Sequence, residues 1–190
     1  MLQVPVQELP QLPSQPADDC SAFLQRAVAA GAGVRVGTMQ VDVTAYLTGA
    51  DDLSFSGARL IIDERNERLN GDKVRCTTRE ISAEPIESKD RLLVNLDDQS
   101  VRHIPALKPT DESWRYTINI EVATTDCYCR YHLELDLDVN NESRTFVIND
   151  TSIGYDKSES LPGLVPFQLS GSGSGNLYDF RGDRWQAVAG

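Results

Sequence analysis

Apolar and polar residues alternate with a period of two through most of positions 115–139, the longest regular pattern in this chain. Successive side chains of a β-strand point to opposite faces of its sheet. The alternation therefore predicts two long strands, 115–123 and 127–139, each with an apolar face toward a core and a polar face toward water. The apolar set of the second strand is Cys127, Cys129, Tyr131, Leu133, Leu135, Leu137 and Val139, and the polar set is Tyr128, Arg130, His132, Glu134, Asp136 and Asp138.

Shorter runs predict further strands on both sides of this pair, separated by Gly, Asn and Asp residues that favour turns. Asn140-Asn141 predicts a tight turn after the second long strand. A helix is expected after Asp18 or Asp19, where a carboxylate can cap the first turn, and Gly31 and Gly33 should end it. The expected short strands are 34–36, 39–43, 53–55, 59–62, 74–78, 91–95, 101–104, 145–149, 165–169, 177–180 and 185–188.

These elements predict three regions and a mostly β fold class with one short N-terminal helix. Residues 1–17 contain four prolines and are expected to form an extended, polyproline-like arm. Residues 18–106 are expected to form a β-rich unit of the helix and short strands. Pro105 and Pro109 indicate a boundary, after which residues 107–190 are expected to form an antiparallel β-sandwich of the jelly-roll or immunoglobulin-like type.

The arm carries apolar residues that could anchor it across a neighbouring subunit. Strand edges and the arm together would supply main-chain hydrogen bonds for such an assembly. A mobile tail is the alternative interpretation. The partner-binding residues that we predict on the arm are Leu2, Val4, Val6, Leu9 and Leu12.

Charge and hydropathy narrow the range of partners. The net charge of −11 opposes binding to nucleic acid or to an anionic membrane surface. No apolar run approaches the roughly 18 residues of a transmembrane helix. The N-terminus lacks the basic and apolar regions of a secretory signal peptide, so we expect a virion or cytoplasmic assembly rather than a secreted protein.

The four cysteines could form disulfides or bind zinc, and the sequence gives little support to either interpretation. Cys127 and Cys129 lie on the apolar face of one strand, which favours buried free thiols in a chain without an export signal. Their spacing differs from the usual zinc knuckle, and His132 is expected on the opposite face. We therefore predict no metal site.

Candidate catalytic groups are absent or have simpler explanations. The sequence contains no Ser nucleophile elbow, HExxH or Walker A lysine, so we expect no catalytic residue and no cofactor. The pairs Asp18/Asp19, Asp51/Asp52, Asp97/Asp98 and Asp111/Glu112 fall at expected turns or caps, where local hydrogen bonding favours Asp. The polar face with His132 and Glu134 is interpreted as a solvated strand face with Arg130 as counter-charge. The alternating Ser and Gly of 170–175 are interpreted as a flexible loop.

Arg181-Gly182-Asp183 matches a cell-adhesion tripeptide. An Arg and an Asp displayed on a Gly turn can span a cation-binding groove on a receptor. The same three common residues also arise by chance, so this remains a candidate receptor-binding site beside the arm.

Residues 18–62 resemble the N-terminal cap of pectate-lyase-like, right-handed β-helix proteins of the phage tailspike type. The similarity lies in DDCSAFLQRAVAAGAGVRV, a paired Asp followed by a helix with a Leu-Gln-x-Ala core, and in LSFSGARLII. The family's Pro-x-Gly-x-Tyr element is replaced here by residues 36–40, and the chain is too short for many rungs of about 20 residues. The resemblance implies a virion or appendage context and carries over no catalytic residue.

Taken together, the sequence predicts a non-enzymatic structural protein that assembles with copies of itself or with a larger assembly such as a capsid or tail. A phage-type virion component, meaning a decoration protein or a head or tail accessory protein, is the specific expectation. One alternative is a glycan- or receptor-binding module that uses the C-terminal loops. Another is a carbohydrate-active enzyme on a truncated β-helix.

Overall fold

A computed structural model describes residues 2–3, 24, 27–46, 52–76, 89–106, 115–150, 154–158, 165–181 and 184–188. The fold is mostly β, as predicted. The helical residues that the structure describes are Leu24 and residues 27–29, and they precede the first long strands. The strands are β1 (Leu2–Gln3), β2 (Val34–Val36), β3 (Thr38–Tyr46), β4 (Leu53–Glu67), β5 (Lys73–Cys76), β6 (Asp90–Asn95), β7 (Ser100–Ile104), β8 (Arg115–Ala123), β9 (Cys127–Val139), β10 (Glu142–Ile148), β11 (Tyr155–Asp156), β12 (Phe167–Ser170), β13 (Leu177–Arg181) and β14 (Arg184–Ala187).

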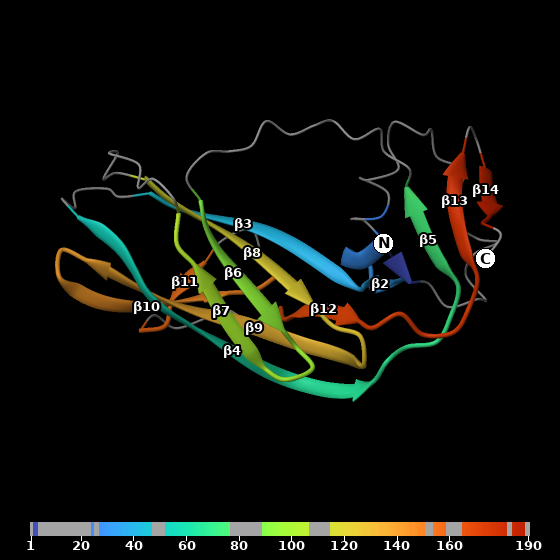
Figure 1. The fold of residues 1–190 in the computed structure, drawn as a ribbon, viewed down its shortest axis with the longest axis horizontal. Coiled ribbons are helices and arrows are strands. Elements are labelled where there is room, and N and C mark those ends of the chain that lie inside the picture. The colour runs from blue at the N-terminus through green and yellow to red at the C-terminus, as the bar shows by residue number, and fades with distance from the viewer. Residues whose placement is uncertain are drawn as a thin grey trace.

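Two sheets face each other in a sandwich (Figure 1). Sheet B has the order β3-β8-β6-β7. Sheet A is centred on β9, which pairs with β4 along one edge and with β10 and β12, one after the other, along its other edge. The long axis of the molecule follows β4 and β9. The two strands predicted from the alternating pattern, β8 and β9, therefore lie in opposite sheets.

The core fills the space between these sheets. Sheet B contributes the apolar faces of β6 and β8, and sheet A contributes the apolar face of β9. Burial of these side chains is the main source of stability, at about 25 cal/mol for each Å² of apolar surface removed from water. The buried core side chains are Met39, Leu92, Val94, Leu96, Ile118, Ile120, Val122, Cys127, Cys129, Tyr131, Leu133, Leu135, Leu137, Ile148, Phe167 and Leu169.

The boundary predicted near residue 106 does not separate two sheets. β3 and β6 precede it, and both pair with β8, which follows it. β4 also precedes it and pairs with β9 over the whole length of that strand. The sheets are mixed rather than purely antiparallel, because β6–β8, β12–β2 and β13–β5 are parallel pairs.

β4 replaces two strands that the sequence separated at Ser56-Gly57. This dipeptide forms an irregularity within one continuous strand, where the pairing with β9 shifts register between Phe55 and Gly57. A second shift lies between Ile62 and Glu64. Asn140 and Asn141, in contrast, form the predicted tight turn between β9 and β10, and both have positive φ.

Sheet A continues beyond the sandwich as β12-β2-β1-β5-β13-β14. β1 and β14 lie at the same end of the molecule (Figure 1). A small second core forms here, where Ala27 and Val74 are buried and Tyr178 and Trp185 pack against them. The first residues of the predicted arm also differ from expectation, because Leu2 and Gln3 pair with β2 and β5 of their own chain.

The Ser-Gly segment 170–175 is a packed strap rather than the flexible loop that we predicted. A Cβ atom on Gly171, Gly173 or Gly175 would lie 2.1, 2.0 or 2.1 Å from a backbone oxygen of Thr125, Leu69 or Gly71, respectively. The strap also exchanges backbone hydrogen bonds with its neighbours, including Gly71 N to Ser174 O at 2.8 Å. Glycine at alternate positions allows this close approach of two backbones, which composition alone does not reveal.

The predicted free thiols of Cys127 and Cys129 are instead joined in a disulfide. The two residues do lie on the same buried face of β9, as the alternation indicated, and this common face brings the two sulfur atoms together. Cys76 of β5 is disulfide-bonded as well. Among the described residues, no helix has the length and apolar character that a membrane span requires.

Candidate functional site

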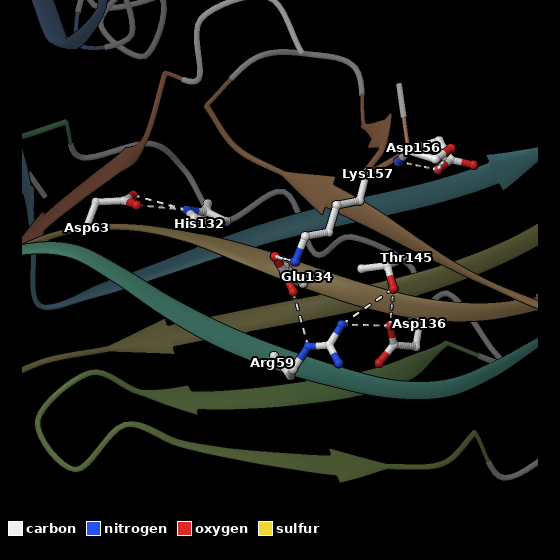
Figure 2. Close-up of polar contacts among 9 residues, drawn as sticks. Arg59, Asp63, His132, Glu134, Asp136, Thr145, Asp156 and Lys157 are labelled. Atoms are coloured by element: carbon white, nitrogen blue, oxygen red, sulfur yellow. Dashed lines mark hydrogen bonds and ion pairs between the residues drawn. The ribbon is translucent and has the colours of Figure 1, made fainter. Parts of the chain in front are cut away.

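Charged side chains gather on the outer face of sheet A, the face of β9 that points away from the core (Figure 2). Arg59 of β4 donates to Glu134 Oε2 through Nε at 3.1 Å and to Asp136 Oδ1 through Nη2 at 3.1 Å. Lys157, which follows β11, donates to Glu134 Oε1 at 2.6 Å. Thr145 of β10 donates to Asp136 Oδ1 at 2.7 Å. We call these five residues the charged cluster, and it connects β4, β9, β10 and the segment after β11.

Glu134 is the central acid of the charged cluster, and only 6% of its side chain is exposed. Burial raises the pKa of its carboxyl, but hydrogen bonds from Lys157 and Arg59 outweigh burial and hold that pKa below its ordinary value. Each oxygen of Glu134 already accepts a hydrogen bond from a cation. The two acids and the two cations balance, so the charged cluster is suited to cross-linking strands rather than to giving or taking protons near neutral pH.

The outer face of β9 is therefore not the solvated face that we predicted. His132 and Glu134 are buried, and the counter-charges of Glu134 are Arg59 and Lys157. Arg130, the predicted counter-charge, instead pairs with Glu64 of β4 at 3.1 Å. The alternation correctly placed these side chains on one face, but it could not show that a segment 23 residues further along the chain would cover them.

His132 is separate from the charged cluster. Its Nδ1 lies 3.0 Å from an oxygen of Asp63, which sits at the second irregularity of β4 (Figure 2). Ile61 lies opposite His132, so alternation along β4 places Asp63 on the same face. No group of three or more His, Cys, Asp or Glu residues in the described part of the chain has the arrangement of a metal site.

Paired carboxylates were predicted to serve turns, and Asp98 has a local role of this kind. Asp98 Oδ1 accepts from the backbone N–H of Ser100 within the β6–β7 turn. Asp97 does more, because its carboxylate also accepts from Thr124, Thr125 and Asp126 of the β8–β9 connection. Asp52 donates its backbone N–H to Asn140 Oδ1. The pairs Asp18/Asp19 and Asp111/Glu112 lie outside the described residues.

Among the described residues, a groove runs between β3 of sheet B and β10 of sheet A, with a mostly apolar first part and a second part of mixed polarity. One part of it has a volume of about 440 Å³ and an adjoining part about 410 Å³. Val43, Thr44, Ile148 and Gly154 line both parts, so the two form one continuous groove. The apolar lining of the first part is Val43, Ala45, Tyr46, Leu53, Leu135, Leu137, Val139, Phe146 and Ile148.

The groove leaves apolar side chains of the inner faces incompletely covered. Val41, Val43 and Ala45 of β3 face the core but are only partly buried, as is Phe146 of β10. Tyr46, at the end of β3, has 65% of its surface exposed. Within the described chain, β3 pairs with β8 alone, so its opposite edge borders the groove. The groove therefore runs beside this edge of sheet B.

Most of the residues predicted to bind partners lie outside the described residues. Leu2 lies in β1, and Val4, Val6, Leu9 and Leu12 lie outside the described residues. Arg181 ends β13 and pairs in register with Arg184, the first residue of β14. Arg181 Nη2 donates to Asp179 at 3.0 Å, while Gly182 and Asp183 lie outside the described residues.

Sequence reasoning missed the groove. Its β3 wall carries a visible signal, since Met39, Val41 and Val43 alternate with polar residues. Its other wall, however, belongs to β9 and β10, and periodicity within one strand does not reveal which strand of another sheet faces it. Comparison of the chain with protein-family models, with curated proteins and with solved structures found no match.

Proposed function

We propose that this protein is a non-enzymatic structural protein that works by assembling with copies of itself or with a larger protein assembly. A phage-type virion component, such as a capsid decoration protein or a head or tail accessory protein, is the specific form of the proposal. Localisation in a virion or in a cytoplasmic assembly follows from it, and no nucleic acid, membrane insertion or cofactor is part of it.

The observation that carries the proposal is the groove beside β3, which is the last strand of sheet B among the described residues. Monomeric proteins usually protect an edge strand with charge, with a bulge or with covering chain, since an open edge readily pairs with another strand. Here the edge adjoins partly exposed Val41, Val43 and Ala45. An added strand would gain main-chain hydrogen bonds from the edge and apolar contacts from the groove.

The charged cluster supports a structural role in a different way. Its acids are fully engaged with Arg59, Lys157 and Thr145, so it strengthens the sheet without presenting a free catalytic group. The acidic balance of the chain, −11 overall, helps a protein that is crowded in an assembly to stay in solution until its specific contacts form. The likeness of residues 18–62 to the cap of tailspike-type β-helix proteins supports the virion context.

Light scattering coupled to size-exclusion chromatography tests the proposal on the purified full-length chain. We expect a defined oligomer whose mass falls on dilution or after substitution of groove residues. A monomer at every protein concentration tested would contradict self-assembly. A parallel screen of polysaccharides for cleavage addresses the enzyme alternative, and measurable depolymerase activity would overturn the non-enzymatic assignment.

A further inference from the structure

The disulfide between Cys127 and Cys129 lies inside the core of the sandwich. Cys127 is 2% exposed and Cys129 is 0% exposed. Cys129 lies opposite Leu169 of β12, which is also 0% exposed. A redox reagent in solution therefore has no direct access to either sulfur atom while the sandwich is intact.

The end of β9 that carries the disulfide is held on several sides. Both β4 and β12 pair with β9 at Cys129. The carbonyl oxygen of Cys127 accepts a hydrogen bond from Gly171 N of the strap at 2.7 Å. Cys127 N donates to Thr124 Oγ1 at 3.2 Å, and Thr124 Oγ1 in turn donates to Asp97. Exposure of the sulfur atoms thus requires the strand pairs and the strap to open, and movement of a single loop does not suffice.

Formation of a disulfide requires access to the sulfur atoms. One cysteine thiolate attacks the disulfide of an oxidant and forms a mixed disulfide, and the second cysteine thiolate then attacks that bond and releases the oxidant as a dithiol. The two cysteine thiols lose two electrons and two protons, and the oxidant takes up both. Because the folded sandwich encloses both sulfur atoms, this exchange must precede the closure of β12 and sheet B over β9.

The surroundings in which the chain folds decide whether the exchange can occur. Glutathione and thioredoxin keep thiols reduced in the cytosol, whereas disulfides form and persist in oxidising compartments and outside the cell. Every cysteine that the structure describes, namely Cys76, Cys127 and Cys129, is in a disulfide. A chain that folded in a reducing cytosol would instead enclose two thiols, and later transfer to oxidising surroundings would not join them.

We propose that the Cys127–Cys129 disulfide forms before the sandwich closes, and that the chain consequently folds outside the reducing cytosol, with a protein or small-molecule disulfide as the oxidant. The closed sandwich then protects the bond from reductants. The inference does not depend on self-assembly, but it narrows the location of any assembly, because chains that fold in the cytosol would carry two thiols at this site.

Thiol trapping tests where the bond forms. The full chain is produced in a reducing bacterial cytosol and, with an added export signal, in the oxidising periplasm. Whole cells are quenched with acid and the protein is alkylated under denaturing conditions. Trypsin cleaves after Arg115 and Arg130, so residues 116–130 form one peptide that contains both cysteines. Mass spectrometry should find two alkyl groups on this peptide from the cytosol and none on the peptide from the periplasm.

Reduction of the oxidised protein tests the enclosure. Dithiothreitol without urea should leave the 116–130 disulfide intact for long after it has reduced oxidised glutathione in the same tube, and urea should accelerate the reaction. Leu169→Ala removes the buried side chain opposite Cys129 and should speed reduction at least about tenfold. Gln168→Ala, on the other face of β12, is the matched control and should react at nearly the wild-type rate.

The outcomes bear separately on this inference and on the proposed function. A disulfide in the cytosolic chain, or two thiols in the exported chain, would overturn the inference. Reduction of the wild-type protein without urea as fast as that of glutathione would overturn the enclosure on which it depends. Light scattering on the oxidised sample measures assembly independently: a disulfide-bonded monomer would contradict self-assembly and support this inference, and an oligomer with two thiols at the site would do the reverse.

Discussion

Glu134 and Lys157 lie 2.6 Å apart, Oε1 to Nζ, although Glu134 occupies the middle of β9 and Lys157 comes after the short strand β11. This contact holds the segment after β11 against the outer face of sheet A (Figure 2). It also changes the character of that face, because a carboxylate that alternation assigns to water becomes buried between two cations.

The charged cluster should make stability depend on pH in the acid range. The pKa of Glu134 is lowered in the folded protein, so folding favours its charged form. The resulting stability is present above the ordinary Glu pKa of about 4.3 and is lost as pH falls through the lower folded pKa. Glu134→Gln should cost about 1–3 kcal/mol at pH 7, and the difference from wild type should shrink in acid.

Urea unfolding at pH 7, 4 and 3 measures this effect. Glu64→Gln is the matched control, because Glu64 pairs with Arg130 at an exposed site where ion pairs contribute little. An unchanged difference between Glu134→Gln and wild type across these pH values would show that the charge of Glu134 is not what stabilises the sheet.

The strap should be intolerant of side chains at its glycines. Gly173→Ala would place a methyl group 2.0 Å from the backbone oxygen of Leu69, so one of the two backbones must move. We expect a loss of about 1–3 kcal/mol in the free energy of unfolding, measured by chemical denaturation. The neighbouring Ser172 is exposed, and Ser172→Ala should leave the denaturation midpoint nearly unchanged. Equal midpoints for the two variants would argue that the strap is loose.

Loss of the Asp97 carboxylate should destabilise the protein more than loss of the Asp98 carboxylate, although the two residues are adjacent and chemically identical. The carboxylate of Asp97 accepts from Thr124 Oγ1 at 2.7 Å and from Thr125 N at 2.8 Å, which joins two turns. Burial raises its pKa, but these hydrogen bonds outweigh burial and lower it. Asp97→Ala should cost about 2 kcal/mol, whereas Asp98→Ala should have a smaller effect. Thermal unfolding of both variants decides this, and the reverse order would contradict the joined turns.

Arg181, the first residue of the adhesion tripeptide, should also contribute to stability. Arg181 and Arg75 both donate to the buried carboxylate of Asp179, and the Arg75 guanidinium holds the pKa of that carboxyl below its ordinary value. Arg181→Ala should therefore lower the denaturation midpoint, and Arg75→Ala, which removes two hydrogen bonds, should lower it further.

Asp183→Ala should abolish any cell adhesion and leave assembly unchanged. Adhesion that survives Asp183→Ala would rule out the tripeptide.

Alternation predicted β8 and β9 well because both strands bury one continuous apolar face. It could not predict that Ser56-Gly57 would stay within β4, since a Ser-Gly pair can mark either a turn or a bulge and only the partner strand distinguishes them. The flexible interpretation of 170–175 failed for a related reason. Glycine confers mobility in solvent but permits close packing beside another backbone, and here the neighbours are Leu69 and Gly71.

The site was harder to predict than the fold. The groove depends on β3 and β10 lying in opposite sheets, and the charged cluster depends on Lys157 returning to β9. Both are contacts between segments far apart in the chain. Local periodicity identifies which face of a strand is apolar, but it leaves open which distant segment covers that face.

β9 receives hydrogen bonds along both edges, from β4 on one side and from β10 and β12 on the other. β3 and β4 are synthesised long before β8 and β9, their pairing partners. During translation, β3 and β4 are made before their partner strands exist, so their apolar faces stay uncovered until β8 and β9 follow. Pairing between segments so far apart in the chain slows folding. The backbone amides of β9 should in turn be the slowest in the molecule to exchange with deuterated solvent, since neither edge opens without breaking a neighbouring strand away.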